Sequence, residues 1–337
     1  MLDDYISYLS PIDQLINLKR QMQKFFKFNP RILLELPLHF CGCAIVLMSL
    51  SLLSDQGENM KHIDGTFKGV RNIDVYYQGW LPDGEVKAVL FIVHGLGEYV
   101  GRYTNVIDYF VPRGYAIYGV DHIGHGKSGG EREMLVRFED YTEPLSTFYK
   151  MVAGWQPGKP IVIYGHSLGG LITSFYLLEE QAKFKAAIIS AAGVKVPDNI
   201  SSTTVLLGKV LSALAPKAGI LGLDTTYLSH DKNVVDLYNA DPLVFHGKTP
   251  ARLAAEMLRA MKIVSGTAGK ITLPVFILHG SGDKIVDPAA SQMLYEKVGS
   301  KDRTLKIYDG LYHEIHNEPE REVMFKEVED WLQTRLN

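Results

Sequence analysis

The chain has 337 residues, with 35 Lys and Arg against 38 Asp and Glu and a formal net charge of −3 at pH 7. This balance gives no electrostatic case for binding nucleic acid. The chain has only 2 cysteines, which lie close together in an apolar segment, so no disulfide framework is indicated. Without the first 59 residues, roughly 275 residues remain, enough for one large α/β domain with a sizeable core.

The first 59 residues form an N-terminal extension that contains the apolar segment 38–53. Its length of about 16 residues is marginal for a membrane span. The segment is a candidate anchor, an interfacial helix or a late signal-like sequence, and a translation start at Met60 is a further alternative. If it spans a bilayer, the upstream Lys and Arg residues favour a cytoplasmic N-terminus. We expect membrane association, with a cytoplasmic protein as the alternative.

A buried strand is predicted at 89–93, followed by the glycine-rich loop 94–97. A helical segment at 102–113 and a strand ending at Asp121 follow. A dinucleotide-binding unit has the same order of elements: a strand, a Gly-x-Gly loop, a helix and a second strand that ends in an acid. The third glycine of that fingerprint falls one position late, however, which argues against this alternative.

The next loop contains Gly126-Lys-Ser-Gly-Gly130, one of two Gly-x-Ser-x-Gly matches in the chain. No strand leads directly into it and charged residues follow, so we interpret Ser128 as loop structure. Its Gly-Lys-Ser also resembles the end of a phosphate-binding loop, but Asp121 stands where that motif requires its first glycine. The phosphate-loop interpretation therefore fails.

The second match, Gly165-His-Ser-Leu-Gly169, lies directly between a predicted strand at 161–164 and a predicted helix at 171–180. A serine in such a sharp turn needs small residues two positions to either side, and Gly165 and Gly169 supply them. Ser167 is therefore a candidate nucleophile, provided that the chain also supplies a histidine base and an acid.

Two later strands supply both groups. The buried run 274–278 leads to Asp283, which we assign as the acid, and the alternating run 304–308 leads to His313, which we assign as the base. Weaker candidates are Asp287 and Asp309 for the acid and His316 for the base. The chain order Ser, Asp, His is the α/β-hydrolase arrangement, so we expect an α/β fold with a mostly parallel central sheet flanked by helices.

Acyl transfer also needs N–H donors for the oxyanion. In this fold one donor follows the nucleophile, here Leu168, and the other lies in the loop after an early strand, here Leu96. An intact set of these groups argues against a hydrolase-fold protein that only binds a ligand, which stays the distant alternative.

No strand-like run occurs between the sixth strand, 186–190, and residue 274, so we interpret about 192–270 as a helical cap inserted after that strand. Apolar residues at 205–207, 210–211 and 214 form one helix face within it. This face either packs against the core or is a lipid-facing lid.

From about residue 63 to 332 the chain resembles the monoacylglycerol lipase family, serine hydrolases related to lysophospholipases. The resemblance is carried by the segments 94–103, 121–132 and 304–316. It implies a triad of Ser167, Asp283 and His313 with Leu96 and Leu168 as oxyanion donors, which the spacing also predicts. It further implies a glycerol-binding end of the pocket made by Glu98, Arg102, Tyr238 and His316. The spacing of Glu98 and Arg102 also fits a helix-face ion pair.

The chain departs from the family at three points. Tyr99 stands where the family commonly has histidine, and Leu96 is bulkier than the alanine often found there, so acyl-chain preference does not carry over. The cap cysteines of the animal enzymes are absent, so thiol-based regulation does not carry over either.

We therefore expect a serine hydrolase that cleaves monoacylglycerols to fatty acid and glycerol through an acyl-enzyme intermediate. A lysophospholipase or short-chain carboxylesterase with the same triad is the alternative. The expected partners are a lipid substrate and a membrane surface that the cap contacts. Because His and Cys do not cluster at metal-ligand spacing and serine chemistry needs no metal, no cofactor is expected.

Overall fold

The structure, a computed structural model, describes residues 60–196 and 202–336. The apolar segment 38–53 lies outside these residues. The described residues belong to the compact unit Asn59–Asn337. None of the helices in this part of the chain is long and apolar enough to cross a membrane.

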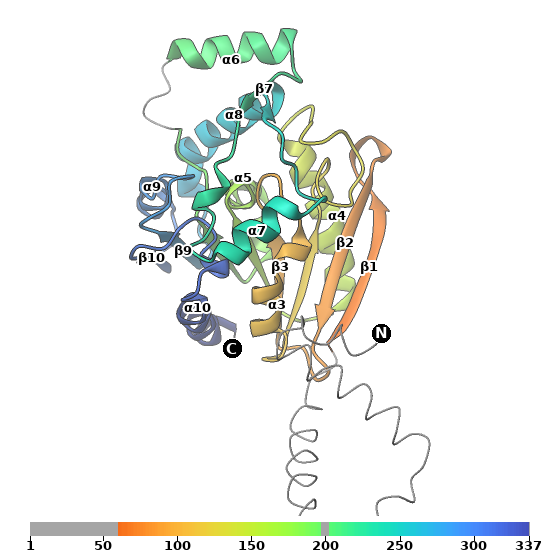
Figure 1. The fold of residues 1–337 in the computed structure, drawn as a ribbon. Coiled ribbons are helices and arrows are strands. Elements are labelled where there is room, and N and C mark those ends of the chain that lie inside the picture. The colour runs from red at the N-terminus through yellow and green to blue at the C-terminus, as the bar shows by residue number, and fades with distance from the viewer. Residues whose placement is uncertain (1–59, 197–201, 337) are drawn as a thin grey trace, which may run out of the picture. The chain divides into compact units, whose positions relative to one another are not determined.

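The centre of the domain is an eight-stranded sheet with the strand order β1-β2-β4-β3-β5-β6-β9-β10 (Figure 1). Strand β2 runs antiparallel to both of its neighbours, β1 and β4, whereas the pairs from β4 to β10 are parallel. The expected mostly parallel sheet of an α/β fold is confirmed. The strands are β1 Lys61–Lys68, β2 Asp74–Leu81, β3 Ala88–Val93, β4 Tyr115–Val120, β5 Ile161–His166, β6 Ala186–Ser190, β9 Val275–Gly280 and β10 Arg303–Tyr308.

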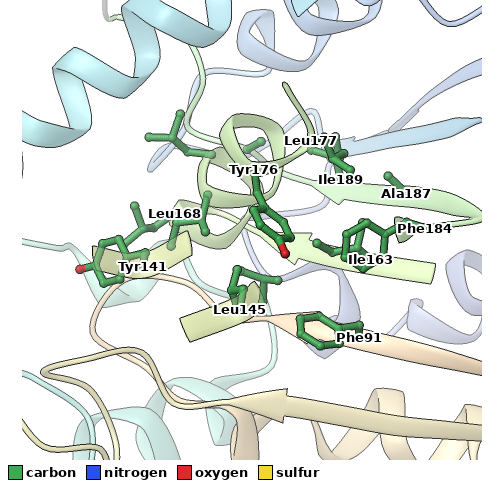
Figure 2. Packing of buried hydrophobic residues seen from close by; sticks show 14 of the residues in the cluster. Phe91, Tyr141, Leu145, Ile163, Leu168, Tyr176, Leu177, Phe184, Ala187 and Ile189 are labelled. Atoms are coloured by element: carbon green, nitrogen blue, oxygen red, sulfur yellow. The ribbon is translucent and has the colours of Figure 1, made fainter. Parts of the chain in front are cut away.

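Helices cover both faces of this sheet. They are α3 Thr104–Phe110, α4 Glu139–Trp155, α5 Leu168–Glu180, α9 Ala289–Lys297 and α10 Arg321–Leu336. Successive strand residues point to opposite faces, so Phe91 joins the core cluster with α4 and α5 while Leu90 joins the cluster with α3 and α10. Figure 2 shows part of the first cluster, where Phe91 and Ile163 lie near Leu145 of α4. Burial on both faces explains why the central strands are continuous apolar runs.

The segment between β6 and β9 is the one interpreted from the sequence as a cap, and we keep that name for it. It contains α6 Ser202–Leu214, β7 Gly219–Leu221, α7 Lys232–Ala240, β8 Thr249–Pro250 and α8 Ala251–Thr267. The expectation of no strand here was wrong, since β7 and β8 pair antiparallel, but strands this short leave no alternating pattern in the sequence. Helix α8 contributes Leu253 and Val264 to the core.

Several single-turn 3-10 helices connect these elements in the described residues. They are η3 Val70–Asn72, η4 Val100–Arg102, η5 Gln181–Lys183, η6 Thr225–Tyr227, η7 Ala268–Lys270 and η8 Ile315–Asn317. Two of them, η4 after β3 and η8 after β10, lie at the sheet's carboxyl edge. Because parallel strands end at one edge, the loops after β3, β5, β9 and β10 meet there, and the predicted site residues lie in them.

Candidate active site

Ser167 lies in the turn between β5 and α5. Its backbone is strained, with φ 55° and ψ −119°, a conformation that a non-glycine residue keeps only when its surroundings enforce it. A Cβ on Gly169 would lie 1.9 Å from the Val93 carbonyl oxygen, and one on Gly165 would lie 2.2 Å from Thr173 Oγ1. Glycine is therefore required at both positions, as the sequence predicted.

Asp283 and His313 are in direct contact. His313 Nδ1 donates to Asp283 Oδ2 at 2.7 Å, and the backbone N–H groups of Ile285 and Val286 donate to Asp283 Oδ1. His279 Nε2 lies 3.0 Å from both Asp283 Oδ2 and the Val286 carbonyl oxygen, so it carries the proton. The carboxylate is thus held on both oxygens and the histidine is oriented through Nδ1.

The charges in this pair favour an ionised acid beside a basic histidine. Burial would raise the pKa of Asp283, but His313 and the hydrogen bonds that Asp283 accepts outweigh it and hold this pKa well below its usual range. Burial would lower the pKa of His313, but the neighbouring Asp283 carboxylate outweighs it and raises this pKa. Glu314 and Glu98 raise it further, but Asp283 contributes most, so removing the Asp283 charge should lower the pKa of His313.

A cavity of about 610 Å³ joins the predicted residues at the carboxyl edge of the sheet. Ser167 and His313 line it together with Leu96 and Leu168. Its further lining is mostly apolar and includes Leu221, Leu223, Leu228, Met257, Met261, Ile285 and Val286. Glu98, Tyr238 and Glu314 also line it. These three lie together, since Arg102 contacts each of them, and we call this part of the cavity its polar end.

The loop after β3 lies directly against the nucleophile turn. A Cβ on Gly95 would lie 3.2 Å from Ser167 Cβ, so glycine allows the loop to approach Ser167. The Gly95 N–H donates to Glu98 Oε1 at 2.6 Å, and Gly97 has φ +74°. Glu98 therefore holds the loop that carries Leu96.

Glu98, Arg102 and Glu314 form a buried charged cluster. Arg102 Nη1 donates to Glu98 Oε2 at 2.7 Å, and the guanidinium makes a bidentate pair with Glu314 at 2.7 and 2.9 Å. Burial would raise the pKa of Glu314, but Arg102 outweighs it and lowers this pKa. Burial raises the pKa of Glu98, which the Glu314 charge also raises. Two carboxylates thus share one guanidinium at the polar end of the cavity.

The four residues of the expected glycerol end do not all line the cavity that contains Ser167. Glu98 and Tyr238 line the cavity. Arg102 lies 4.5 Å from the Tyr238 ring centroid and lines a second cavity of about 550 Å³ beside α7. His316 lines neither cavity; it is buried and stacks on Tyr103 at 4.9 Å, and burial lowers its pKa to about 4.

The second Gly-x-Ser-x-Gly match has a structural explanation. Ser128 Oγ donates to the Asp121 carbonyl oxygen at 2.6 Å and accepts from the Tyr76 N–H at 2.8 Å. The Asp121 carboxylate is buried and accepts from the N–H groups of Val100 and Lys127. The hydrogen bonds of Ser128 and Asp121 hold the backbone of the loop after β4. Asp121, the acid of the rejected dinucleotide-binding pattern, therefore has a structural role here.

Two residues beside the predicted triad were not expected from the sequence to have a part in the site. His279 Nε2 contacts Asp283 Oδ2 at 3.0 Å. Glu314 directly follows His313, and its partner Arg102 is 212 positions away. The only sequence signal for Glu314 is a carboxylate next to the predicted base. Within the described ranges, no His, Cys, Asp and Glu cluster could hold a metal ion.

Comparisons with known proteins agree with this geometry. A family model described as "Serine aminopeptidase, S33" matches residues 84–320. A monoacylglycerol lipase of Mycolicibacterium smegmatis is 35% identical over 271 residues, which cover 80% of this chain and 97% of the relative. A monoglyceride lipase of Rattus norvegicus is 34% identical over 260 residues, covering 76% and 86% of the two chains. The crystal structure of Paleococcus ferrophilus monoacylglycerol lipase has a TM-score of 0.68 at 28% identity, covering 82% of this chain and 100% of that one.

The fold and these matches define a serine hydrolase of the α/β-hydrolase superfamily. The chain belongs to the family of the serine aminopeptidase S33 model and, by its relatives, to the monoacylglycerol lipases within it. The resemblance predicted from the sequence motifs is thereby confirmed.

Proposed function

We propose that this protein hydrolyses monoacylglycerols to fatty acid and glycerol. The observation that carries the proposal is a cavity lined by both Ser167 and the Asp283-bonded His313, with apolar side chains and the polar groups of Glu98 and Tyr238 in the same lining. An acyl chain fits the apolar lining, and a small neutral polyol fits the polar end. The relatives named above support this substrate class.

In the proposed reaction, Ser167 Oγ attacks the ester carbonyl carbon while His313 Nε2 accepts its proton. Asp283 stabilises the imidazolium through Nδ1. The backbone N–H groups of Leu96 and Leu168 stabilise the oxyanion, a contribution that is usually the largest single one in acyl transfer. His313 then donates its proton to the glycerol oxygen as the C–O bond breaks, which leaves an acyl-Ser167 ester.

Deacylation repeats these steps with water. His313 accepts a proton from water as its oxygen attacks the acyl carbon, and returns the proton to Ser167 Oγ as the fatty acid leaves. No cofactor has a part in either half of the cycle.

For the polar end we propose two kinds of role. Glu98 and Tyr238, which line the cavity, contact the glycerol directly. Arg102 and His316 position these residues without contacting the glycerol. Arg102 pairs with Glu98, and His316 stacks on Tyr103, whose hydroxyl donates to Glu98.

We also propose that the cap contacts a membrane surface. The described apolar side chains of α6 are exposed, with Leu207 at 63% and Leu214 at 81% of their full accessibility, so these side chains do not pack on the core. Leu221 and Leu223 are exposed too and line the cavity. An apolar surface next to the cavity would let an insoluble substrate pass from a bilayer to Ser167.

The test compares fatty-acid release from monooleoylglycerol, lysophosphatidylcholine and a short-chain ester by the wild-type protein and by Ser167→Ala. Loss of Ser167 should reduce turnover by about 10⁶-fold. Ser167-dependent release that favours the monoglyceride supports the proposal. Preference for either other substrate moves the function to the lysophospholipase or esterase alternative, and no Ser167-dependent turnover on any ester contradicts the hydrolytic role.

A further inference from the structure

The loop that carries His313 is bonded to the cap segment that begins with η6. The His313 N–H donates to the Tyr227 carbonyl oxygen at 3.3 Å, and the Glu314 N–H donates to the Leu228 carbonyl oxygen at 2.7 Å. The Tyr312 ring stacks on the His230 ring at 3.7 Å between centroids. The histidine loop is therefore held on one side by the cap.

Glu318 lies where the two segments meet. Its carboxylate is fully buried and accepts from the Tyr312 N–H at 2.7 Å. From the cap it accepts from the His230 N–H at 2.9 Å, from His230 Nδ1 at 3.0 Å and from Ser229 Oγ at 3.1 Å. One carboxylate thus accepts from one donor of the histidine loop and three of the cap, and the Ser229 hydroxyl shares its proton with the Asn317 carbonyl oxygen at 3.0 Å.

The Glu318 carboxylate is bonded to the backbone next to His313, so its position affects the position of the proposed base. A buried carboxylate is tolerated only when hydrogen bonds replace its hydration, and these bonds tie it to both segments. Tyr312 directly precedes His313, so the bond to the Tyr312 N–H fixes the backbone from which the His313 ring projects. Displacing a reacting group by about 1 Å can lower a rate by about 10²-fold.

We propose that Glu318 is a positioning residue for His313, acting through the Tyr312 N–H and the cap residues Ser229 and His230. The cap segment 227–230 is then a structural support of the catalytic histidine as well as part of the cover. This inference rests on the proposed role of His313 as the base. It predicts that loosening the cap at this point impairs the chemical step before it impairs substrate binding.

The test is Glu318→Gln, with Glu320→Gln as the matched control because Glu320 is an exposed glutamate two positions on. Glutamine replaces one carboxylate oxygen by an NH₂ group, which is itself a donor and cannot accept the hydrogen bonds that this oxygen accepts. With a soluble p-nitrophenyl ester we expect kcat to fall by about 10- to 100-fold while KM stays within about twofold, and Glu320→Gln to match the wild type. The low-field proton NMR signal of His313 Nδ1–H should shift or broaden in Glu318→Gln alone.

A wild-type kcat and His313 signal in folded Glu318→Gln would overturn the inference, as would a change in KM alone. If that variant does not fold, His230→Ala and Ser229→Ala remove the two side-chain donors of the cap singly and leave the bonds from the Tyr312 and His230 N–H groups, and unchanged kcat in both overturns it instead. If the wild-type protein cleaves no ester, the proposed function fails, whereas the His313 proton signal still decides whether Glu318 positions that ring.

Discussion

Arg102 and Glu314 form a bidentate ion pair in which Nη1 and Nη2 lie 2.7 and 2.9 Å from the two carboxylate oxygens. Arg102 follows the loop that carries Leu96, and Glu314 follows His313, so the pair joins the proposed oxyanion loop to the proposed base. Glu98 completes the cluster on the first of these loops.

Arg102→Met should destabilise the fold by about 3–5 kcal/mol at pH 8, because it leaves two buried carboxylates without a cation. Both carboxyls then have folded pKa values above their unfolded values, so the loss should shrink as the pH falls through these folded values. Urea unfolding at pH 8 and pH 5 measures both effects. The exposed Arg137 serves as a control, since Arg137→Met should cost about 1 kcal/mol or less.

Gly169→Ala should prevent correct folding or abolish activity, because the new Cβ would lie 1.9 Å from the Val93 carbonyl oxygen. Gly154 lies inside α4, and a Cβ at this position would have no neighbouring atom within 4 Å outside its own helix backbone. Gly154→Ala should therefore stabilise the protein by about 0.5–1 kcal/mol. Thermal unfolding and ester hydrolysis of both variants give the comparison, and a fully active, stable Gly169→Ala protein would contradict the tight turn.

Asp283→Asn should lower kcat by about 10⁴-fold while the protein stays folded. Turnover needs neutral His313, so activity is lost as the pH falls through the pKa of His313. Asp283 raises that pKa, and its neutralisation should move the acid limb of the pH profile of kcat/KM to lower pH. A limb that stays in place would show that another group controls it.

Leu207→Ser combined with Leu214→Ser should weaken binding to phospholipid vesicles by about tenfold or more, because exposed apolar side chains supply the burial energy at an interface. Hydrolysis of a soluble ester is the reference, since neither side chain lines the cavity around Ser167. Val323→Ser on α10 removes an apolar group that is also exposed, at 58%, and should leave vesicle binding unchanged. Equal binding by all proteins in a sedimentation assay would count against membrane contact through α6.

Much of the fold could be predicted because its signals are local. The continuous apolar runs at 89–93 and 161–164 indicated strands buried on both faces, and the comparisons confirm the α/β-hydrolase class. The glycines around Ser167 indicated the sharp turn, since contacts between near neighbours exclude a larger residue there. Ser167, Asp283 and His313 follow separate strands, and the rule that parallel strands end at one edge was enough to predict their proximity.

The sequence by itself therefore determined the strands, the nucleophile turn and the order of the proposed triad, because each depends on the periodicity or the sterics of residues close in the chain. The tertiary structure alone decided that Arg102 pairs with Glu314, that His230 bonds Glu318 and that the described apolar side chains of α6 are exposed. A charged side chain can pair with any partner that folding brings near, and an apolar helix face can face core or solvent. Only the packing of distant segments selects between these outcomes.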